Sequence, residues 1–187
     1  MRCYKLTTQK MTTQGNTVWG EGVTHTPKES DGGLCSGAVI HAYTHPLLAV
    51  LLNPIHADIT KPILWEAEGH GEMLNDHGLK IGFRGGLTTI RQIPLPVVTT
   101  EMRVRFAILC AKEVYSDKAW NAWADKWLSG EDRSGDAAHT AARAAAARSV
   151  AAAAWDAAYA AARAAAYARA HIDLIAIAEI ACAEVPR

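Results

Sequence analysis

The stretch LTTIRQIPLPVVTTEMRVRFAILCAKEVY, residues 87–115, contains the change of character that decides the fold. Before Thr99, short apolar runs are separated by Gly, Pro, Asn and Asp, which is typical of strands joined by tight connections. After it, glycine becomes rare and strong helix formers dominate. Thr99 and Thr100 can cap a helix that has Glu101 in its first turn. We therefore predict an α+β protein, with an α+β domain over residues 1–98 and a helical region over residues 99–187.

The composition limits the classes of protein to which the chain can belong. Half of its 187 residues are apolar, which is enough to bury the core of one domain and a smaller appendage. Lysine plus arginine equal aspartate plus glutamate, at 19 each, so no net charge favours nucleic acid or an anionic membrane as a partner. The sequence contains no signal peptide and no run of about 18 apolar residues, so we expect a cytoplasmic protein.

The cysteines are widely spaced and form no CxxC pair. This spacing predicts reduced, separately buried thiols, and it argues against a disulfide framework or a zinc knuckle. The cysteines are Cys3, Cys35, Cys110 and Cys182.

Five segments of the first domain have the composition of strands. The Gly85-Gly86 pair between the last two segments suits the turn of a tight hairpin. We predict a small mixed or antiparallel sheet accompanied by one short helix. The five segments are residues 2–8, 17–25, 61–69, 79–85 and 87–95.

The short helix is predicted within the stretch CSGAVIHAYTHPLLAVLLNPIHADI, residues 35–59. Pro46 fits the first turn of a helix, where its missing N–H costs nothing. We expect a helix over residues 46–52 that is apolar on nearly all sides and therefore packed, with Asn53-Pro54 as its end.

The histidines of this stretch raise the question of a metal site. His41 and His45 would form a metal-binding pair only if one helix held both, and Pro46 disfavours helical geometry at His45. A zinc site that recruits Cys35 or His56 is the alternative. We predict instead that the histidines are buried or cap the turn from strand to helix, and we predict no metal site and no cofactor.

The motif WEAEGHGE, residues 65–72, places Glu66, Glu68, His70 and Glu72 at every second position. On a strand these four side chains share one face. Three carboxylates and a histidine can bind a divalent cation or perform acid–base chemistry. The interpretation that we favour is the solvated face of an edge strand, with the residues between them pointing inward.

The second region is predicted to form helices over about residues 101–115, 117–129 and 136–185, with a possible break near 149 or 172. The third segment is rich in alanine, the strongest helix former. Alanine-lined faces let helix axes approach closely, so we expect this segment to fold into a hairpin or to pair with the same segment of a second copy.

Aromatic side chains mark helix faces that we expect to be covered. Trp120, Trp123 and Trp127 fall on one face at i, i+3 and i+7, and Trp155 and Tyr159 stand one turn apart in the alanine-rich segment. The interpretation that we favour is packing, within the chain or against a second copy, and an aromatic platform for a ligand is the alternative. We predict a homo-oligomer formed through the C-terminal helices.

Four motifs in order, YKLTTQKMTTQG, LCSGAVIHAYTHPLLAVLLNP, ILWEAEGHGE and LTTIRQI, resemble an uncharacterised domain family common in phage and prophage proteins. The likeness covers about residues 1–95. Cys35, Gly37, His41 and Ala42 match the central motif of the family, and the alanine-rich tail after WLSGEDRS resembles tails of phage-borne members. The family has no established activity, so the resemblance implies a context, the cytoplasm of a bacterial host.

The order of motifs is also similar to that of ADP-ribosyltransferase-like folds, in which a first-strand residue, a strand followed by a short helix and a late glutamate surround NAD. This resemblance implies a nucleotide cleft lined by Tyr4, Lys5, His41 and Tyr43. Arg91 stands near the place where the family has its catalytic acid, which implies binding without transfer. We therefore predict these five residues as ligand-binding and no residue as catalytic.

Three hypotheses for function follow. The first is a non-enzymatic phage or prophage accessory protein that binds, and so inhibits or sequesters, a component of host defence, either a host protein or a small nucleotide signal. The second is an enzyme acting on NAD or a related nucleotide through His41 and an acid from Glu66, Glu68 or Glu72. The third is a structural protein of the virion.

Overall fold

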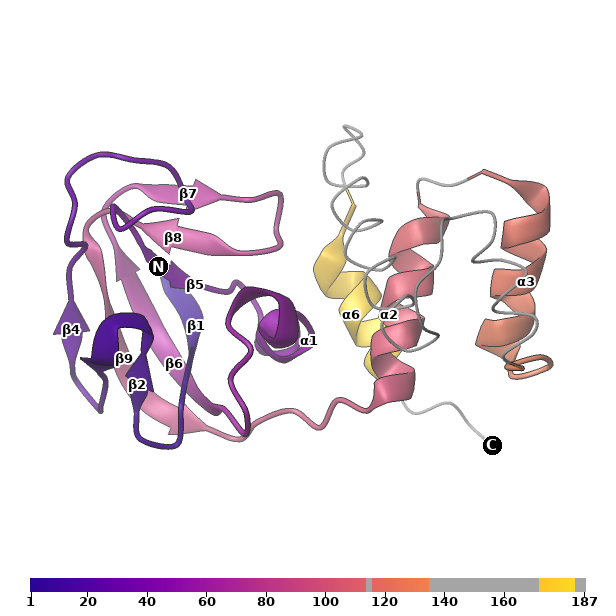
Figure 1. Ribbon diagram of the computed structural model, residues 1–187, viewed down its shortest axis with the longest axis horizontal. Helices are drawn as coiled ribbons and strands as arrows, with labels where there is room; N and C mark the ends of the chain where they lie inside the picture. Colours follow the sequence, from indigo (N-terminus) through magenta and orange to yellow (C-terminus); the bar gives the residue numbers. More distant parts are fainter. Residues whose placement is uncertain (114–115, 135–171, 184–187) are drawn as a thin grey trace. The chain divides into compact units, whose positions relative to one another are not determined.

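The computed structural model describes residues 1–113, 116–134 and 172–183 of the chain (Figure 1). The chain divides into two compact units, Met1–Val97 and Val98–Arg187. The first unit is built from antiparallel sheets and one α-helix, and the described part of the second consists of α-helices. The fold is therefore α+β, as the sequence predicts.

The strands of the first unit form two main sheets and a small hairpin, all antiparallel. The four-stranded sheet has the order β1-β6-β9-β4, and the three-stranded sheet has the order β5-β8-β7. In the small hairpin, the 3-10 turn η1 (Gln14–Asn16) joins β2 to β3. The strands are β1 (Arg2–Thr7), β2 (Thr12–Thr13), β3 (Thr17–Val18), β4 (Thr24–His25), β5 (Ile40–Ala42), β6 (Ile63–His70), β7 (Met73–Asn75), β8 (Ile81–Phe83) and β9 (Gly86–Ile93).

One long bent hairpin contributes to both main sheets. Strands β6 and β7 form one arm and pair with β9 and β8 of the other arm. The arms bend at Gly71, whose φ is +74°, and at Gly85, whose N–H donates to the His70 carbonyl at 2.9 Å. The prediction of a hairpin turn at Gly85-Gly86 is wrong, because β8 and β9 do not pair with each other. A Cβ on Gly85 would lie 2.7 Å from the His70 backbone. The absence of a side chain at Gly85 therefore allows the two arms to approach closely.

An isolated bridge between Tyr4 and Tyr43 joins the two sheets. The N–H of each tyrosine donates to the carbonyl of the other at 2.9 Å. The strands therefore form a closed ring of neighbours. β1 lies beside β6 and β6 beside β9; β8, which belongs to the same hairpin arm as β9, lies beside β5, and the bridge joins β5 back to β1. One buried core cluster draws side chains from every part of this ring and from the segment before β4: Cys3, Trp19, Ala42, Ala67, Ile81, Phe83 and Leu87.

Helix α1 (Pro46–His56) begins where the sequence predicts. Pro46 occupies its first position, and the His45 ring caps it by accepting a hydrogen bond from the Leu47 N–H at 3.3 Å. The prediction of a histidine cap at this turn is therefore confirmed. As expected from its composition, the helix is packed on most sides, and its six buried residues are Leu48, Ala49, Val50, Leu51, Leu52 and Asn53.

The predicted end of this helix at Asn53-Pro54 is wrong, because Pro54 lies inside the helix. The following residues are held by Asn53. Its carbonyl accepts a hydrogen bond from the Ala57 N–H at 2.9 Å, and its side chain bonds both the N–H and the carbonyl of Ile59, at 3.1 and 3.0 Å. These contacts of Asn53, all within six residues along the chain, hold the end of the helix around Pro54 despite the preference of proline.

Each described helix of the second unit begins after a threonine or aspartate that caps it, and for the first helix this is the predicted Thr99. Thr99, Asp117 and Asp173 each accept a hydrogen bond from a backbone N–H of the first turn. Gly130 follows the second of these helices with φ +82°, the left-handed conformation that glycine favours at a helix end. The third of these helices begins at Leu174, close to the possible break predicted near 172, and residues 135–171 before it lie outside the described part of the chain. The helices among the described residues of this unit are α2 (Thr100–Lys112), α3 (Lys118–Ser129) and α6 (Leu174–Cys182).

Helices α2 and α6 pack against each other through large and small side chains together. Ala178 and Ala181 of α6 are fully buried, at 0% exposure. Small side chains let two helix axes approach closely. The close approach buries surface that large side chains would otherwise have to cover. The buried residues of the pair are Phe106, Ala107, Ile108, Cys110 and Ala111 on α2 and Leu174, Ile177, Ala178 and Ala181 on α6.

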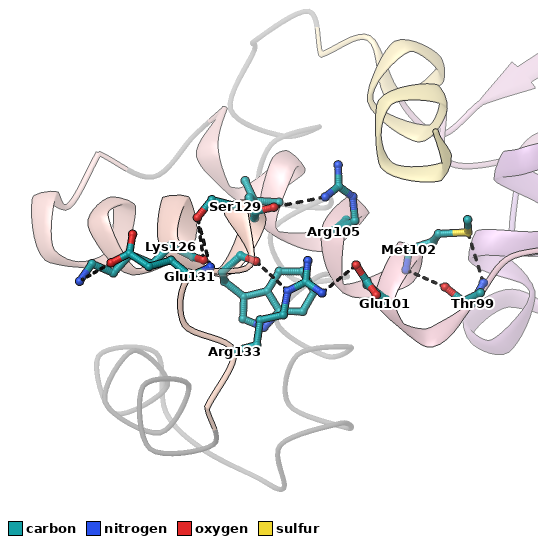
Figure 2. A network of polar contacts seen from close by, with 10 residues as sticks. Thr99, Glu101, Met102, Arg105, Lys126, Ser129, Glu131 and Arg133 are labelled. Atoms are coloured by element: carbon teal, nitrogen blue, oxygen red, sulfur yellow. Dashed lines mark hydrogen bonds and ion pairs between the residues drawn. The ribbon is translucent and has the colours of Figure 1, made fainter. Parts of the chain in front are cut away.

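Polar contacts fasten α3 to α2 (Figure 2). Arg133, which follows α3, pairs with Glu101 of α2 at 2.9 Å and donates to the Trp127 carbonyl at 3.1 Å. Its guanidinium carbon also lies 4.9 Å from the centre of the Trp127 ring, within the range of a cation–π contact. Arg105 of α2 donates to the Leu128 carbonyl at 3.4 Å. Trp127 is thus partly covered from within its own unit.

The other aromatic residues predicted at an interface are only partly accounted for. Trp120 and Trp123 are half-buried, and the centres of their rings are 5.9 Å apart. Trp155, Tyr159, the predicted break near 149 and most of the helix predicted over residues 136–185 lie outside the described residues. Self-association through the C-terminal helices therefore stays a prediction.

Candidate functional site: an arginine pair on the sheet

Charged side chains gather on one face of the four-stranded sheet. Glu66, Glu68 and His70 alternate along β6 with the buried Trp65 and Ala67, as the period of two predicts. The prediction that this is an edge strand is wrong, because β6 pairs with β1 on one side and with β9 on the other. Glu66 and Glu68 therefore each have neighbours on two strands, and His70 has one on β9.

Glu66 is the centre of this face, opposite Tyr4 of β1 and Arg91 of β9. Its Oε1 lies 2.8 Å from the Nε of Arg2. Its Oε2 lies 2.8 Å from the Nε and 2.7 Å from the Nη2 of Arg91. One carboxylate thus holds two guanidinium groups, one from each neighbouring strand.

The two guanidinium groups are exposed although the carboxylate that holds them is buried. The side chains of Arg2 and Arg91 are 65% and 62% exposed, against 11% for Glu66. One carboxylate neutralises only one of the two positive charges, so the three side chains together carry a net charge of about +1. A guanidinium has five N–H donors in a planar fork, and the contacts with Glu66 use only some of them. The arrangement is therefore suited to bind an oxyanion such as a phosphate or a carboxylate.

Further polar groups continue along the same face. Glu68 is 57% exposed, and its Oε1 lies 3.8 Å from the amino group of Met1, which offsets part of the charge of Glu68. His70 hydrogen-bonds to the Thr88 hydroxyl at 2.8 Å, and that hydroxyl is 2.7 Å from the hydroxyl of Thr24. Polar groups of β6, β9 and β4 therefore lie farther along the same sheet and bond to one another.

Glu72, the fourth member of the predicted row, does not share this face. The chain bends at Gly71, just after β6, and Glu72 pairs with Arg84 at 3.1 Å. Arg84 also donates to the Gly32 carbonyl at 2.9 Å. The prediction of four side chains on one face is therefore wrong for Glu72, because the strand ends at His70.

Lys5 follows Tyr4 on β1, and its side chain points to the opposite face of the sheet because successive strand residues alternate. Its Nζ donates to the His41 carbonyl at 2.7 Å and lies 5.2 Å from the centre of the Trp19 ring. Burial lowers the pKa of Lys5 to about 8. A larger share of this amine is therefore neutral near pH 7 than for an exposed lysine.

His41, Tyr43 and His56 form internal contacts around β5 and the end of α1. The His41 ring hydrogen-bonds to the Leu34 carbonyl, and the Tyr43 hydroxyl hydrogen-bonds to Nδ1 of His56 at 3.3 Å, with the two rings stacked at 5.8 Å. Burial lowers the pKa of His41 and lowers that of His56 to about 4, and it raises the pKa of Tyr43. All three side chains are therefore neutral at pH 7 and connect β5 to the elements around it.

The residues weighed as zinc ligands are engaged elsewhere. The Cys35 sulfur accepts a hydrogen bond from the Lys80 ammonium at 3.3 Å, and the rings of His41 and His56 make the contacts described above. Within residues 1–113, 116–134 and 172–183, no three His, Cys, Asp or Glu side chains lie close enough together to hold a metal ion.

The five predicted ligand residues fall into two groups. Tyr4 and Arg91 flank Glu66 on the charged face, and the other three lie around β5. The sequence did not indicate Arg2 as a member of the site, because its partner is set by the register of β1 on β6. The period-two row on β6 did identify Glu66, but its two arginines could not be assigned without the order of the strands.

The chain was also compared with known proteins. No protein-family model, no curated protein and no solved structure matches it. The resemblance to the phage and prophage family therefore stays a prediction. In the described part of the chain, no helix has both the length and the apolar composition needed to cross a membrane.

Proposed function

We propose that this chain is a non-enzymatic accessory protein of a phage or prophage and that its α+β unit binds a small nucleotide signal of host defence. The observation that carries the proposal is the exposed pair Arg2 and Arg91, held by the buried carboxylate of Glu66. The ligand's phosphate group would lie against the two guanidinium groups. Sequestering the signal would be the function of the protein.

The chemistry of the pair favours phosphate as the group that is recognised. Two guanidinium forks can donate several charge-assisted hydrogen bonds to one phosphate, and such bonds are about twice as strong as neutral ones. Glu66 holds both arginines before a ligand arrives, so less side-chain entropy is lost on binding. Tyr4, opposite Glu66 on β1, supplies an aromatic ring beside the arginines for contact with a base or a sugar.

The same geometry favours binding over turnover. Both oxygens of Glu66 are paired with arginines, so this carboxylate is not placed to take a proton from a substrate. His41, the base of the alternative enzyme hypothesis, already hydrogen-bonds to the Leu34 carbonyl through its ring. These contacts support a site that holds a ligand without changing it.

Calorimetric titration of the full chain with NAD and with ADP-ribose tests the proposal. We expect Arg2→Gln and Arg91→Gln each to weaken binding by roughly 10-fold or more, since a hydrogen bond to a charged group contributes about 1.5–3 kcal/mol. Lys10→Gln, which removes the same charge from an exposed position of the same unit, is the control and should bind as the native chain does. Binding should also weaken with added salt.

The other outcomes identify the competing hypotheses. Release of nicotinamide or another product from NAD during the titration would support the enzyme. Equal binding by the native chain and both arginine variants would place the ligand elsewhere. If neither compound binds, the nucleotide proposal is wrong and a host protein becomes the leading partner.

A further inference from the structure

Cys35 differs from the other cysteines in its surroundings. It is exposed, whereas Cys3 and Cys110 are buried and Cys182 is half-buried. Burial raises the pKa of the Cys3 thiol to about 11 and that of Cys110 to about 12. Those two thiols are enclosed and Cys182 is partly so, and Cys35 is therefore the most accessible of the four cysteines to an oxidant dissolved in water.

The Lys80 amine lies within hydrogen-bonding distance of Cys35. Its Nζ lies 3.3 Å from the Cys35 sulfur, although the two residues are 45 positions apart in the sequence. A side-chain amine at this distance is placed to attack the sulfur once that sulfur has been oxidised.

Separate contacts hold the two sides of this pair. On the cysteine side, Arg84 donates to the Gly32 carbonyl at 2.9 Å and the His41 ring bonds to the Leu34 carbonyl. On the lysine side, the Lys80 carbonyl accepts a hydrogen bond from the Asp76 N–H at 3.0 Å, just before β8 begins. The contact between the two side chains is therefore supported by the fold on both sides.

We propose that Cys35 and Lys80 are a modification site at which hydrogen peroxide creates a covalent sulfur–nitrogen link. In the first step the Cys35 thiolate attacks peroxide: an S–O bond forms, the O–O bond breaks, and hydroxide leaves. The sulfur is oxidised by two electrons to a sulfenic acid, and the peroxide is reduced. The Lys80 ammonium gives one proton to that hydroxide and becomes a neutral amine.

In the second step the Lys80 nitrogen attacks the sulfenic sulfur. An S–N bond forms, the S–O bond breaks, and the hydroxyl leaves as water with a second proton from the nitrogen. Thiolate, ammonium and one peroxide thus give the link and two molecules of water. A thiol reductant reverses the reaction by attacking the sulfur and releasing the amine.

Mass spectrometry of the full chain after treatment with hydrogen peroxide tests this proposal. We expect the native chain to lose the mass of two hydrogens, to regain it with dithiothreitol, and to resist tryptic cleavage after Lys80 while it is linked. Cys35→Ser and Lys80→Arg should both abolish the loss of mass. Cys182→Ser, which removes a thiol of the second unit, should leave it unchanged.

Lys80→Arg separates the role of the amine from that of its charge, because arginine keeps the positive charge but is a poor nucleophile. In this variant a sulfenic acid should accumulate and react with a 1,3-dione probe. Equal labelling of the native chain and of Lys80→Arg, without a linked peptide in either, would overturn the proposal. A loss of mass that persists in Lys80→Arg, or a disulfide between two chains in place of the link, would also overturn it.

Discussion

The two units of the chain differ in how far small side chains contribute to their described cores. In the sheet unit, large rings from distant parts of the sequence fill the interior, and Trp65 and Phe83 are each only 1% exposed. Gly69 leaves room for one of them, since a Cβ there would lie 2.2 Å from the Phe83 ring. In the helical unit, fully buried alanines such as Ala178 and Ala181 bring α6 close to α2.

This difference predicts which amino-acid substitutions each unit should tolerate. A core filled by large rings loses most when atoms are removed, because a cavity remains that its neighbours fill only partly. A contact built from small side chains loses most when atoms are added, because the two helices must then separate. The polar groups of the sheet unit add a dependence on pH that follows from their burial.

The largest expected effect is the removal of Trp65. Its ring is buried and its indole N–H donates to the Thr7 hydroxyl at 3.0 Å. We expect Trp65→Ala to lower the free energy of unfolding by about 3–5 kcal/mol. Urea unfolding followed by far-UV circular dichroism measures the change.

Trp127→Ala is the matched change in the helical unit, where the tryptophan is half-buried. It should cost less than about 2 kcal/mol, since less apolar area is lost. Equal losses for the two tryptophan variants would contradict the contrast between the units.

The second-largest expected effect on stability comes from a larger side chain placed between α2 and α6. We expect Ala178→Leu to destabilise the helical unit by about 1–3 kcal/mol, because the larger side chain forces α6 away from α2. Ala122→Leu makes the same substitution at an exposed position of α3 and should change stability by less than about 0.5 kcal/mol. Thermal unfolding of both variants provides the comparison, and an unchanged midpoint for Ala178→Leu would show that the helices do not depend on close approach there.

The smallest effect is the pH dependence that His56 confers. Burial lowers its pKa from 6.5 to about 4 in the folded chain, so between these values the unfolded state binds more protons than the folded state. The stability present above pH 6.5 is therefore lost as the pH falls towards 4. At pH 5 we expect a loss of about 1–2 kcal/mol relative to pH 7.

Replacing the ring isolates this contribution. His56→Phe keeps an aromatic partner for Tyr43 but has nothing to titrate, so its stability should fall less steeply between pH 7 and pH 5. Identical slopes for the native chain and His56→Phe, measured by urea unfolding at a series of pH values, would assign the pH dependence to other groups.

The features that the sequence predicted well are local ones. Thr99, Asp117 and Asp173 cap helices because their side chains bond to N–H groups two or three residues away. The alternation of charged and apolar residues along β6 likewise follows from strand geometry, whatever the neighbours are. The predictions that failed over distant partners are the bend at Gly85 and the central place of β6, whereas the helix end beyond Pro54 depends on contacts of Asn53 within six residues.

The sequence by itself determined the class of the fold, the starts of the helices and the residues of β6 that point inward or outward, because these depend on the nearest few residues along the chain. Only the tertiary structure decided that β6 lies between β1 and β9 and that Arg2 and Arg91 meet at Glu66. It also decided that Cys35 meets Lys80. The physical reason is that strand order and register depend on the packing of distant segments, which no local pattern of residues encodes.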